Sequence, residues 1–138
     1  MELQNTITRE NLETLITLFY HQALKDEQIG HYFKVELGED LNNAEWIKHI
    51  DILIDFWASI FINDPAYGSD PYGPHFTLVG LSSEDFTSWV TLFSQTASEV
   101  YTEEIAQQFK EKGIEYSKDF MKKLKMSTKN SDLTSAYW

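Results

Sequence analysis

The sequence predicts an all-α domain. Apolar residues recur at helical spacing in four long stretches between about residues 8 and 125. The turn signals of β-hairpins are absent, as are internal repeats. All three prolines lie in one segment, residues 63–74, where they exclude a regular helix. These observations predict four long helices, with one irregular loop between the second and the third.

Length and composition fit one folded domain. The chain has 138 residues, of which 42% are hydrophobic and 14% aromatic, so it can bury a substantial core. The aromatic excess fits either a large flat ligand or a core that is simply rich in aromatic side chains. The net charge of −11 argues against nucleic acid or an anionic membrane as the main partner.

The residue types that are missing exclude several kinds of site. Without cysteine the chain forms no disulfide, iron–sulfur cluster or thiolate-ligated haem. The first residues lack the basic and apolar regions of a signal peptide, and no apolar run has the length of a membrane span. We therefore expect a cytoplasmic protein without a membrane partner.

The first helix is predicted to begin after Thr8, which suits an N-cap, with Glu10 in the first turn. Tyr20 lies on the flank of its apolar face, where it either packs in the core or points its hydroxyl into a pocket. The adjacent His21 is expected to be solvated. The apolar face consists of Leu12, Leu15, Ile16, Phe19, Ala23 and Leu24.

A short helical turn is predicted next, over residues 27–33. Asp26 would cap it, and it would end in the aromatic pair Tyr32 and Phe33. His31 is expected at the surface.

The most apolar helix is predicted from about Asn42 to Ile62. His49 borders its apolar face, where a histidine is either a hydrogen-bonded core residue or a functional one. The buried face reads Trp46, Ile50, Leu53, Phe56, Trp57, Ile60 and Phe61.

The loop that follows ends at Pro74 and is directly followed by His75. A histidine held by a proline-rich loop and followed by apolar residues, Phe76 among them, suits a buried axial ligand, although a surface histidine without a role is the alternative.

Two further helices complete the domain. The third long helix is predicted over residues 83–101, with Ser82 as its cap and Glu84 and Asp85 in the first turn. Its apolar stripe includes Phe86 and Trp89. The last helix starts at Thr102. We place the domain at residues 1–125 and expect residues 126–138 to form a polar, mobile tail.

Taken together, these residues resemble the group III truncated haemoglobins, the two-over-two helical globins of bacteria. The resemblance covers about residues 7–124 and rests on five short motifs in this order. They are Leu18-Phe19-Tyr20, Tyr32-Phe33, Trp46-Ile47-Lys48-His49, Pro74-His75 and Phe86-Thr87-Ser88-Trp89. Two features fit this group rather than its relatives: the chain has no Gly-Gly pair, and it combines tyrosine, histidine and tryptophan in the distal positions.

The resemblance implies a two-over-two helical sandwich around haem b and assigns a role to each matching residue. His75 would be the proximal ligand and the metal ligand of the iron. Tyr20, His49 and Trp89 would form the distal set, and Phe33 would stack on the haem face. Leu53, one turn beyond His49, would face the same pocket. We add two phenylalanines to the haem-binding set. Phe76 directly follows His75, and Phe86 lies on the same apolar stripe as Trp89.

The function implied is oxygen binding or transport at a histidine-ligated iron, with nitric oxide, carbon monoxide and cyanide as further ligands. Distal donors would stabilise bound dioxygen, which becomes partly superoxide-like. The alternative is a haem enzyme for nitric oxide or peroxide detoxification in the same pocket, and a helical interaction module without cofactor is a third reading. We expect a monomer that is served by a reductase.

Overall fold

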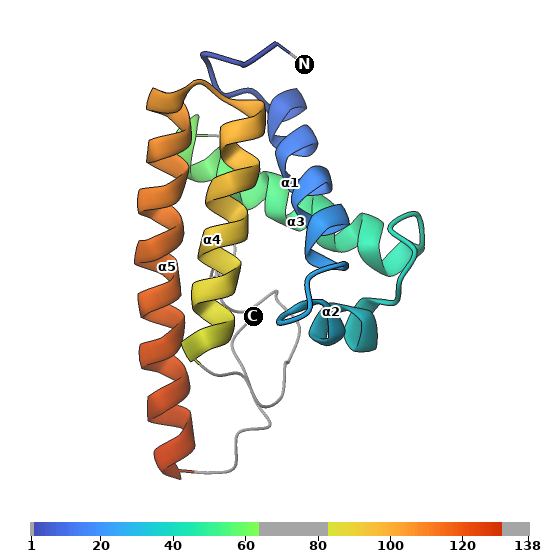
Figure 1. The fold of residues 1–138 in the computed structure, drawn as a ribbon, viewed down its shortest axis with the longest axis vertical. Coiled ribbons are helices and arrows are strands. Elements are labelled where there is room, and N and C mark those ends of the chain that lie inside the picture. The colour runs from blue at the N-terminus through green and yellow to red at the C-terminus, as the bar shows by residue number, and fades with distance from the viewer. Residues whose placement is uncertain (1, 64–82, 131–138) are drawn as a thin grey trace.

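A computed structural model describes residues 2–63 and 83–130. This part of the chain forms five helices, which are shown in Figure 1: α1 (Arg9–Ala23), α2 (Gly30–Leu37), α3 (Ala44–Phe61), α4 (Ser83–Val100) and α5 (Glu103–Asn130). It contains no strand, and its only β-type pairing is an isolated bridge between Gln4 and Tyr101. The prediction of an all-α domain is confirmed.

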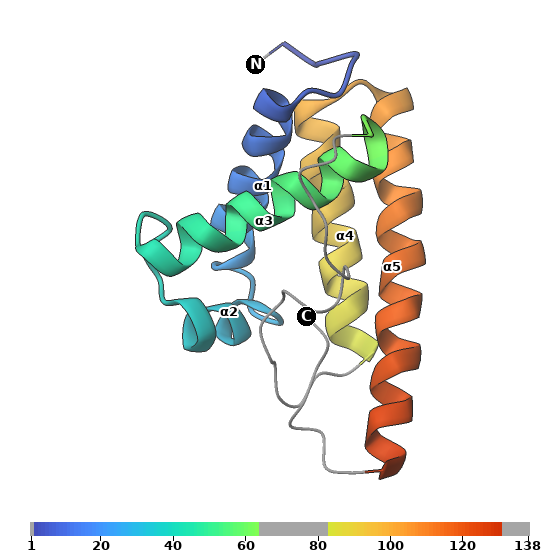
Figure 2. The ribbon, with the colours of Figure 1, turned by 180° about the vertical axis from the view of Figure 1, so that it is seen from behind.

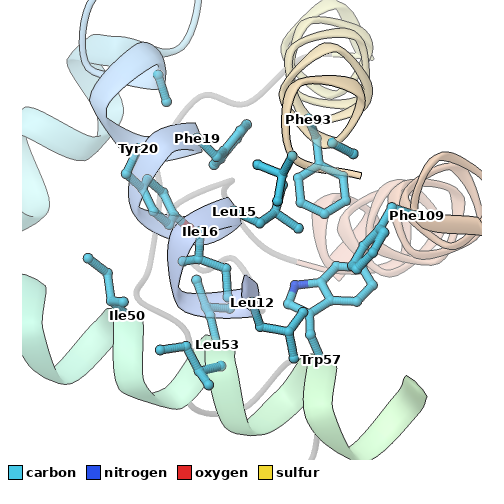
Figure 3. Close-up of a cluster of buried hydrophobic side chains, with 14 of the residues drawn as sticks. Leu12, Leu15, Ile16, Phe19, Tyr20, Ile50, Leu53, Trp57, Phe93 and Phe109 are labelled. Carbon is cyan, nitrogen blue, oxygen red and sulfur yellow. The ribbon is translucent and has the colours of Figure 1, made fainter. Parts of the chain in front are cut away.

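The four long helices form two pairs, α1 with α3 and α4 with α5, and the pairs pack on each other. Helices α4 and α5 run side by side in opposite directions, and α1 lies beside α4 (Figure 1). Helix α3 crosses α1 and α4 on one side of the molecule, as the view from behind shows (Figure 2). Side chains from all four helices meet in the apolar core between the pairs, as Figure 3 shows. The predicted two-over-two arrangement is confirmed.

The start of α1 is fixed by a capping box. The side chain of Thr8 accepts a hydrogen bond from the backbone N–H of Asn11, and the Asn11 side chain accepts one from the backbone N–H of Thr8. The buried hydroxyl of Tyr101 also donates to Asn11 Oδ1 at 2.7 Å. The predicted N-cap is therefore correct, and the same asparagine ties α1 to the corner between α4 and α5.

Helix α2 differs from its predicted position. Asp26 accepts hydrogen bonds from the backbone N–H groups of Gln28 and Ile29, at 2.8 and 3.1 Å. These bonds close a turn rather than start a helix, because an Asp side chain that bonds two residues ahead mimics a backbone turn. The helix begins at Gly30 and continues to Leu37, so the predicted span of residues 27–33 was too early and too short.

Gly30 allows α2 to pack directly on the end of α1. A Cβ atom at this position would lie 2.8 Å from the carbonyl oxygen of Leu24 and 2.9 Å from that of Ala23. Both are backbone atoms, so they cannot move aside as a flexible side chain would. The missing side chain therefore sets how closely Phe33, on α2, approaches Tyr20, near the end of α1.

The ends of α3, α4 and α5 are compared with their predicted positions in the same way. Asn43 caps α3 by accepting a bond from the backbone N–H of Trp46 at 2.8 Å. Ser82, the predicted cap of α4, lies outside the described residues. Helix α5 continues to Asn130, five residues beyond the Lys125 at which we placed the end of the domain. The mobile tail remains a prediction, because residues 131–138 are not described.

Replacing Gly30 with Ala is expected to destabilise the protein by about 1–3 kcal/mol, the usual cost of forcing extra atoms into a packed site. Urea unfolding followed by circular dichroism measures this change. Val35→Ala is the control, because Val35 lies in the same helix and is 83% exposed. Equal stability of the two variants would show that α2 moves away from α1 without cost.

Candidate functional site

The centre of the candidate site is a buried pair of polar side chains from two helices. Tyr20 near the end of α1 and His49 in α3 are 5% and 6% exposed. The Tyr20 hydroxyl oxygen and His49 Nε2 lie 2.9 Å apart, which is hydrogen-bonding distance. Which of the two donates depends on which imidazole nitrogen carries the proton. The two residues predicted for one pocket from separate motifs therefore meet in the structure.

Aromatic rings enclose this pair. The Tyr20 ring lies 5.3 Å from that of Phe33 and 4.8 Å from that of Trp46, centroid to centroid. Trp46 also packs edge-on against the imidazole of His49, and its indole N–H donates to the carbonyl of Gly38 at 2.8 Å. Leu53, one turn after His49, is buried in the same core (Figure 3). The hydrogen bond thus lies in a largely apolar surrounding.

Burial controls the ionisation of Tyr20. It raises the pKa of the phenol far above its usual value, because a phenolate would lose its hydration in this apolar surrounding. The hydroxyl therefore keeps its proton throughout the physiological pH range. It is a permanent donor, with its oxygen free to accept a bond in turn.

Trp89 approaches the site from α4 and is half-buried. Its indole stacks on Phe93 with centroids 5.0 Å apart and planes 11° from parallel. It also lies edge-on to Phe19, whose ring in turn packs against Tyr20 at 5.0 Å. Phe19 therefore connects Trp89 to the Tyr20–His49 pair.

Phe86, one turn before Trp89, is buried with 3% exposure. It helps to line a small groove of about 210 Å³ between α4 and α5. The other lining residues are Thr87, Val90, Thr91, Ile114, Ser117 and Lys118.

Asp85 is a residue whose position the sequence did not reveal. We predicted it only as a helix-capping acid in the first turn of α4, and the structure shows that it is 3% exposed. Its carboxylate accepts hydrogen bonds from the Gln28 side-chain amide at 2.6 Å and from the Tyr32 hydroxyl at 2.9 Å. These bonds join the start of α4, which carries Phe86 and Trp89, to the segment that carries Phe33. No local pattern distinguishes such an acid from a helix-capping one.

The remaining histidines fall into two classes. His21 and His31 are exposed, as predicted. The predicted iron ligand His75 lies outside the described residues, together with Phe76. Among the residues that the structure does describe, no three His, Asp or Glu side chains are grouped to hold a metal ion.

A separate cleft of about 540 Å³ lies beside α1 and contains none of the predicted site residues. Charged and polar side chains dominate its lining, among them Glu13, His21, Lys34 and Asp51. It lacks the enclosed polar pair of the candidate site.

None of the described helices combines the length and the apolar character that crossing a membrane requires.

Comparison with known proteins gives two matches. The group 3 truncated hemoglobin ctb of Campylobacter jejuni is 30% identical to the chain over 100 residues, which are 72% of this chain and 77% of that protein. The crystal structure of a group III truncated hemoglobin from Campylobacter jejuni superposes with a TM-score of 0.79 and 26% identity, covering 89% of this chain and 95% of that one. No family model matches the chain.

The bond between Tyr32 and Asp85 predicts a titration at high pH. Burial, followed by the hydrogen bond to the Asp85 carboxylate and its charge, raises the pKa of Tyr32 to about 12. The folded state thus holds this proton more tightly than the unfolded chain, in which tyrosine titrates near 10. The resulting stabilisation is complete below about pH 10 and is lost as the pH rises towards about 12.

Tyrosinate absorbance at 295 nm is expected to lose its step near pH 12 in Tyr32→Phe. Asp85→Asn is expected to lower the pKa of Tyr32, because it removes the charge. Tyr20→Phe is the control, since the phenol of Tyr20 titrates at still higher pH. An unchanged Tyr32 titration in Asp85→Asn would contradict the role of the carboxylate.

Proposed function

The chain belongs to the group III truncated haemoglobins, and from this premise we propose that it binds haem b and, at the haem iron, dioxygen and other small diatomic ligands reversibly. The observation that carries the proposal is the buried contact of 2.9 Å between the Tyr20 hydroxyl and His49 Nε2. A protonated phenol in an apolar pocket is a donor suited to a small ligand that becomes negatively charged.

The residues fit a haem group in their chemistry. Haem supplies an iron with one position for a protein ligand and one for a small molecule. His75 would hold the iron, since a neutral imidazole is a good axial ligand and the chain offers no thiolate. The absence of cysteine also excludes the covalent attachment of c-type haem, which supports haem b. The apolar contacts to the ring would come from Phe33, Leu53, Phe76 and Phe86.

The Tyr20–His49 pair can orient the Tyr20 hydroxyl as a hydrogen-bond donor towards a ligand. A phenol has one hydrogen but can also accept a bond through its oxygen. If His49 carries its proton on Nε2, it donates to Tyr20, and the Tyr20 hydrogen is left to point at the ligand. Two hydrogen bonds in series, from His49 to Tyr20 and from Tyr20 to the ligand, strengthen the bond to the ligand, because each hydrogen bond polarises the next one. His49 would then act on the ligand through Tyr20, and a swing of its side chain would open a way in.

Trp89 would supply the second donor. Among the described residues its indole N–H has no hydrogen-bond acceptor, whereas the N–H of Trp46 donates to the Gly38 carbonyl. Trp89 is also only half-buried, so the core does not enclose this residue completely. These features support Trp89, rather than Trp46, as a donor to the bound ligand.

Replacing either donor is expected to release dioxygen faster. A hydrogen bond to a charged acceptor contributes about 1.5–3 kcal/mol. At about 1.4 kcal/mol per tenfold change, Tyr20→Phe and Trp89→Phe should each raise the dioxygen dissociation rate by roughly ten- to a hundredfold. Carbon monoxide carries less negative charge on its outer atom, so its release should change much less. Stopped-flow measurements with both gases test this.

His49→Leu provides the contrast in the same experiment. If the imidazole works as a gate, this variant changes mainly the association rates of both gases. Equal acceleration of dioxygen and carbon monoxide release in Tyr20→Phe and Trp89→Phe would mean that these side chains only fill space. The donor assignment would then be wrong, although haem binding itself would stand.

His75→Ala is expected to abolish the bond between the protein and the iron, because no cysteine can replace the lost ligand. Absorption spectra of the ferric, ferrous and carbon monoxide forms measure this loss. His21→Ala and His31→Ala are matched controls that should leave the spectra unchanged, since both side chains are exposed. A five-coordinate histidine–ferrous spectrum that survives in His75→Ala would move the assignment to another histidine.

A further inference from the structure

Gly113 lies in the middle of α5, where it faces two aromatic rings of α4. A Cβ atom at this position would lie 3.3 Å from Phe93 Cδ2 and 3.5 Å from Trp89 Cζ3. The first distance is tighter than an ordinary contact of a Cβ atom, and the second is ordinary. Since glycine is less favourable than alanine inside a helix, this close approach gives a packing reason for its presence.

Phe93 has no room to move away from such an atom. It is 2% exposed and is stacked between Trp89 and Trp57, with centroid distances of 5.0 and 5.2 Å. The edge of Phe19 lies 5.6 Å away, and Phe109 also packs against the ring. Figure 3 shows Phe93 facing Trp57 and Phe109 in the core.

Trp57, on one face of Phe93, is equally confined. It is 4% exposed, and it packs against Phe61 at 5.8 Å and against Phe109 at 5.8 Å. On the opposite face lies Trp89, which is only half-buried. A side chain on α5 that displaces Phe93 is therefore expected to shift Trp89, because this indole is less tightly enclosed than Trp57.

We infer that Gly113 is a positioning residue that sets where the indole of Trp89 lies. Its missing side chain lets Phe93 and Trp89 rest against the backbone of α5. Any side chain at this position would shift the indole relative to Phe19 and Tyr20. The consequence for ligand release rests on the donor role proposed for Trp89, whereas the position of the ring does not.

Gly113→Ala tests the inference in the full-length haem protein. The chain contains four tryptophans, so labelling with 5-fluorotryptophan yields four fluorine resonances, which Trp→Phe variants assign. In the carbon monoxide form, Gly113→Ala is expected to shift the resonance of Trp89 more than that of Trp46. The dioxygen dissociation rate should change by about two- to tenfold, a part of one donor's contribution, and the carbon monoxide rate should change less.

Ser117→Ala is the matched control. Ser117 lies one turn further along α5, is 4% exposed, and faces the groove lined by Phe86 and Val90. This change also replaces a residue of lower helix propensity by alanine. It should leave both the Trp89 resonance and the dioxygen rate unchanged.

Phe93→Leu supplies a second, independent check. A smaller side chain at position 93 leaves room for the added methyl group. Gly113→Ala should therefore shift the Trp89 resonance less in the Phe93→Leu background than in the parent protein, and the difference is the coupling between the two positions.

The outcomes separate this inference from the proposed function. An unmoved Trp89 resonance in Gly113→Ala, or an equal shift in Ser117→Ala, would overturn the positioning role. A shifted resonance without a changed dioxygen rate would overturn its consequence for ligand release, provided that Trp89→Phe does change that rate. If Trp89→Phe leaves the rate unchanged, the proposed donor fails, and the fluorine spectra alone decide the role of Gly113.

Discussion

The arrangement of the helices depends on a stack of aromatic rings where the two helix pairs cross. Trp57 of α3 lies flat on Phe93 of α4, and Phe93 lies flat on Trp89. Such large rings bury much apolar surface, and stacking fixes their relative orientation as well as their distance. The stack therefore sets how α3 crosses α4. It also requires a neighbour without a side chain on α5, and Gly113 meets this requirement.

Two sets of hydrogen-bonded polar side chains near this apolar centre connect distant elements. Tyr20 and His49 join α1 to α3, and Asp85 joins the start of α4 to Tyr32 on α2. Burying a polar group is costly unless it is hydrogen-bonded, so each pair holds two helices at the distance that its bond requires. The groups proposed to act on a ligand thus also hold together the helices that carry them. Donors held in this way need little reorganisation when a ligand binds.

Much of the fold follows from local sequence. Apolar spacing predicted the four long helices, and Thr8 correctly marked the start of the first, because periodicity and capping depend on residues close together in the chain. The family resemblance that the short motifs carry implied one pocket for Tyr20, His49 and Phe33, and the structure brings these three together. The predicted ligand His75 and the roles of all site residues towards haem remain predictions.

Contacts between remote residues could not be predicted in this way. Asp85 looks like a helix-capping acid in the sequence, and only the approach of Gln28 and Tyr32 makes it a buried link. The start of α2 was misplaced because Asp26 serves a turn, and the close packing of Gly30 on α1 is invisible in local patterns. The sequence by itself determined the four long helices and indicated which side chains are candidates for the site. The tertiary structure alone decided how near these side chains lie, because that distance depends on packing between segments far apart in the chain.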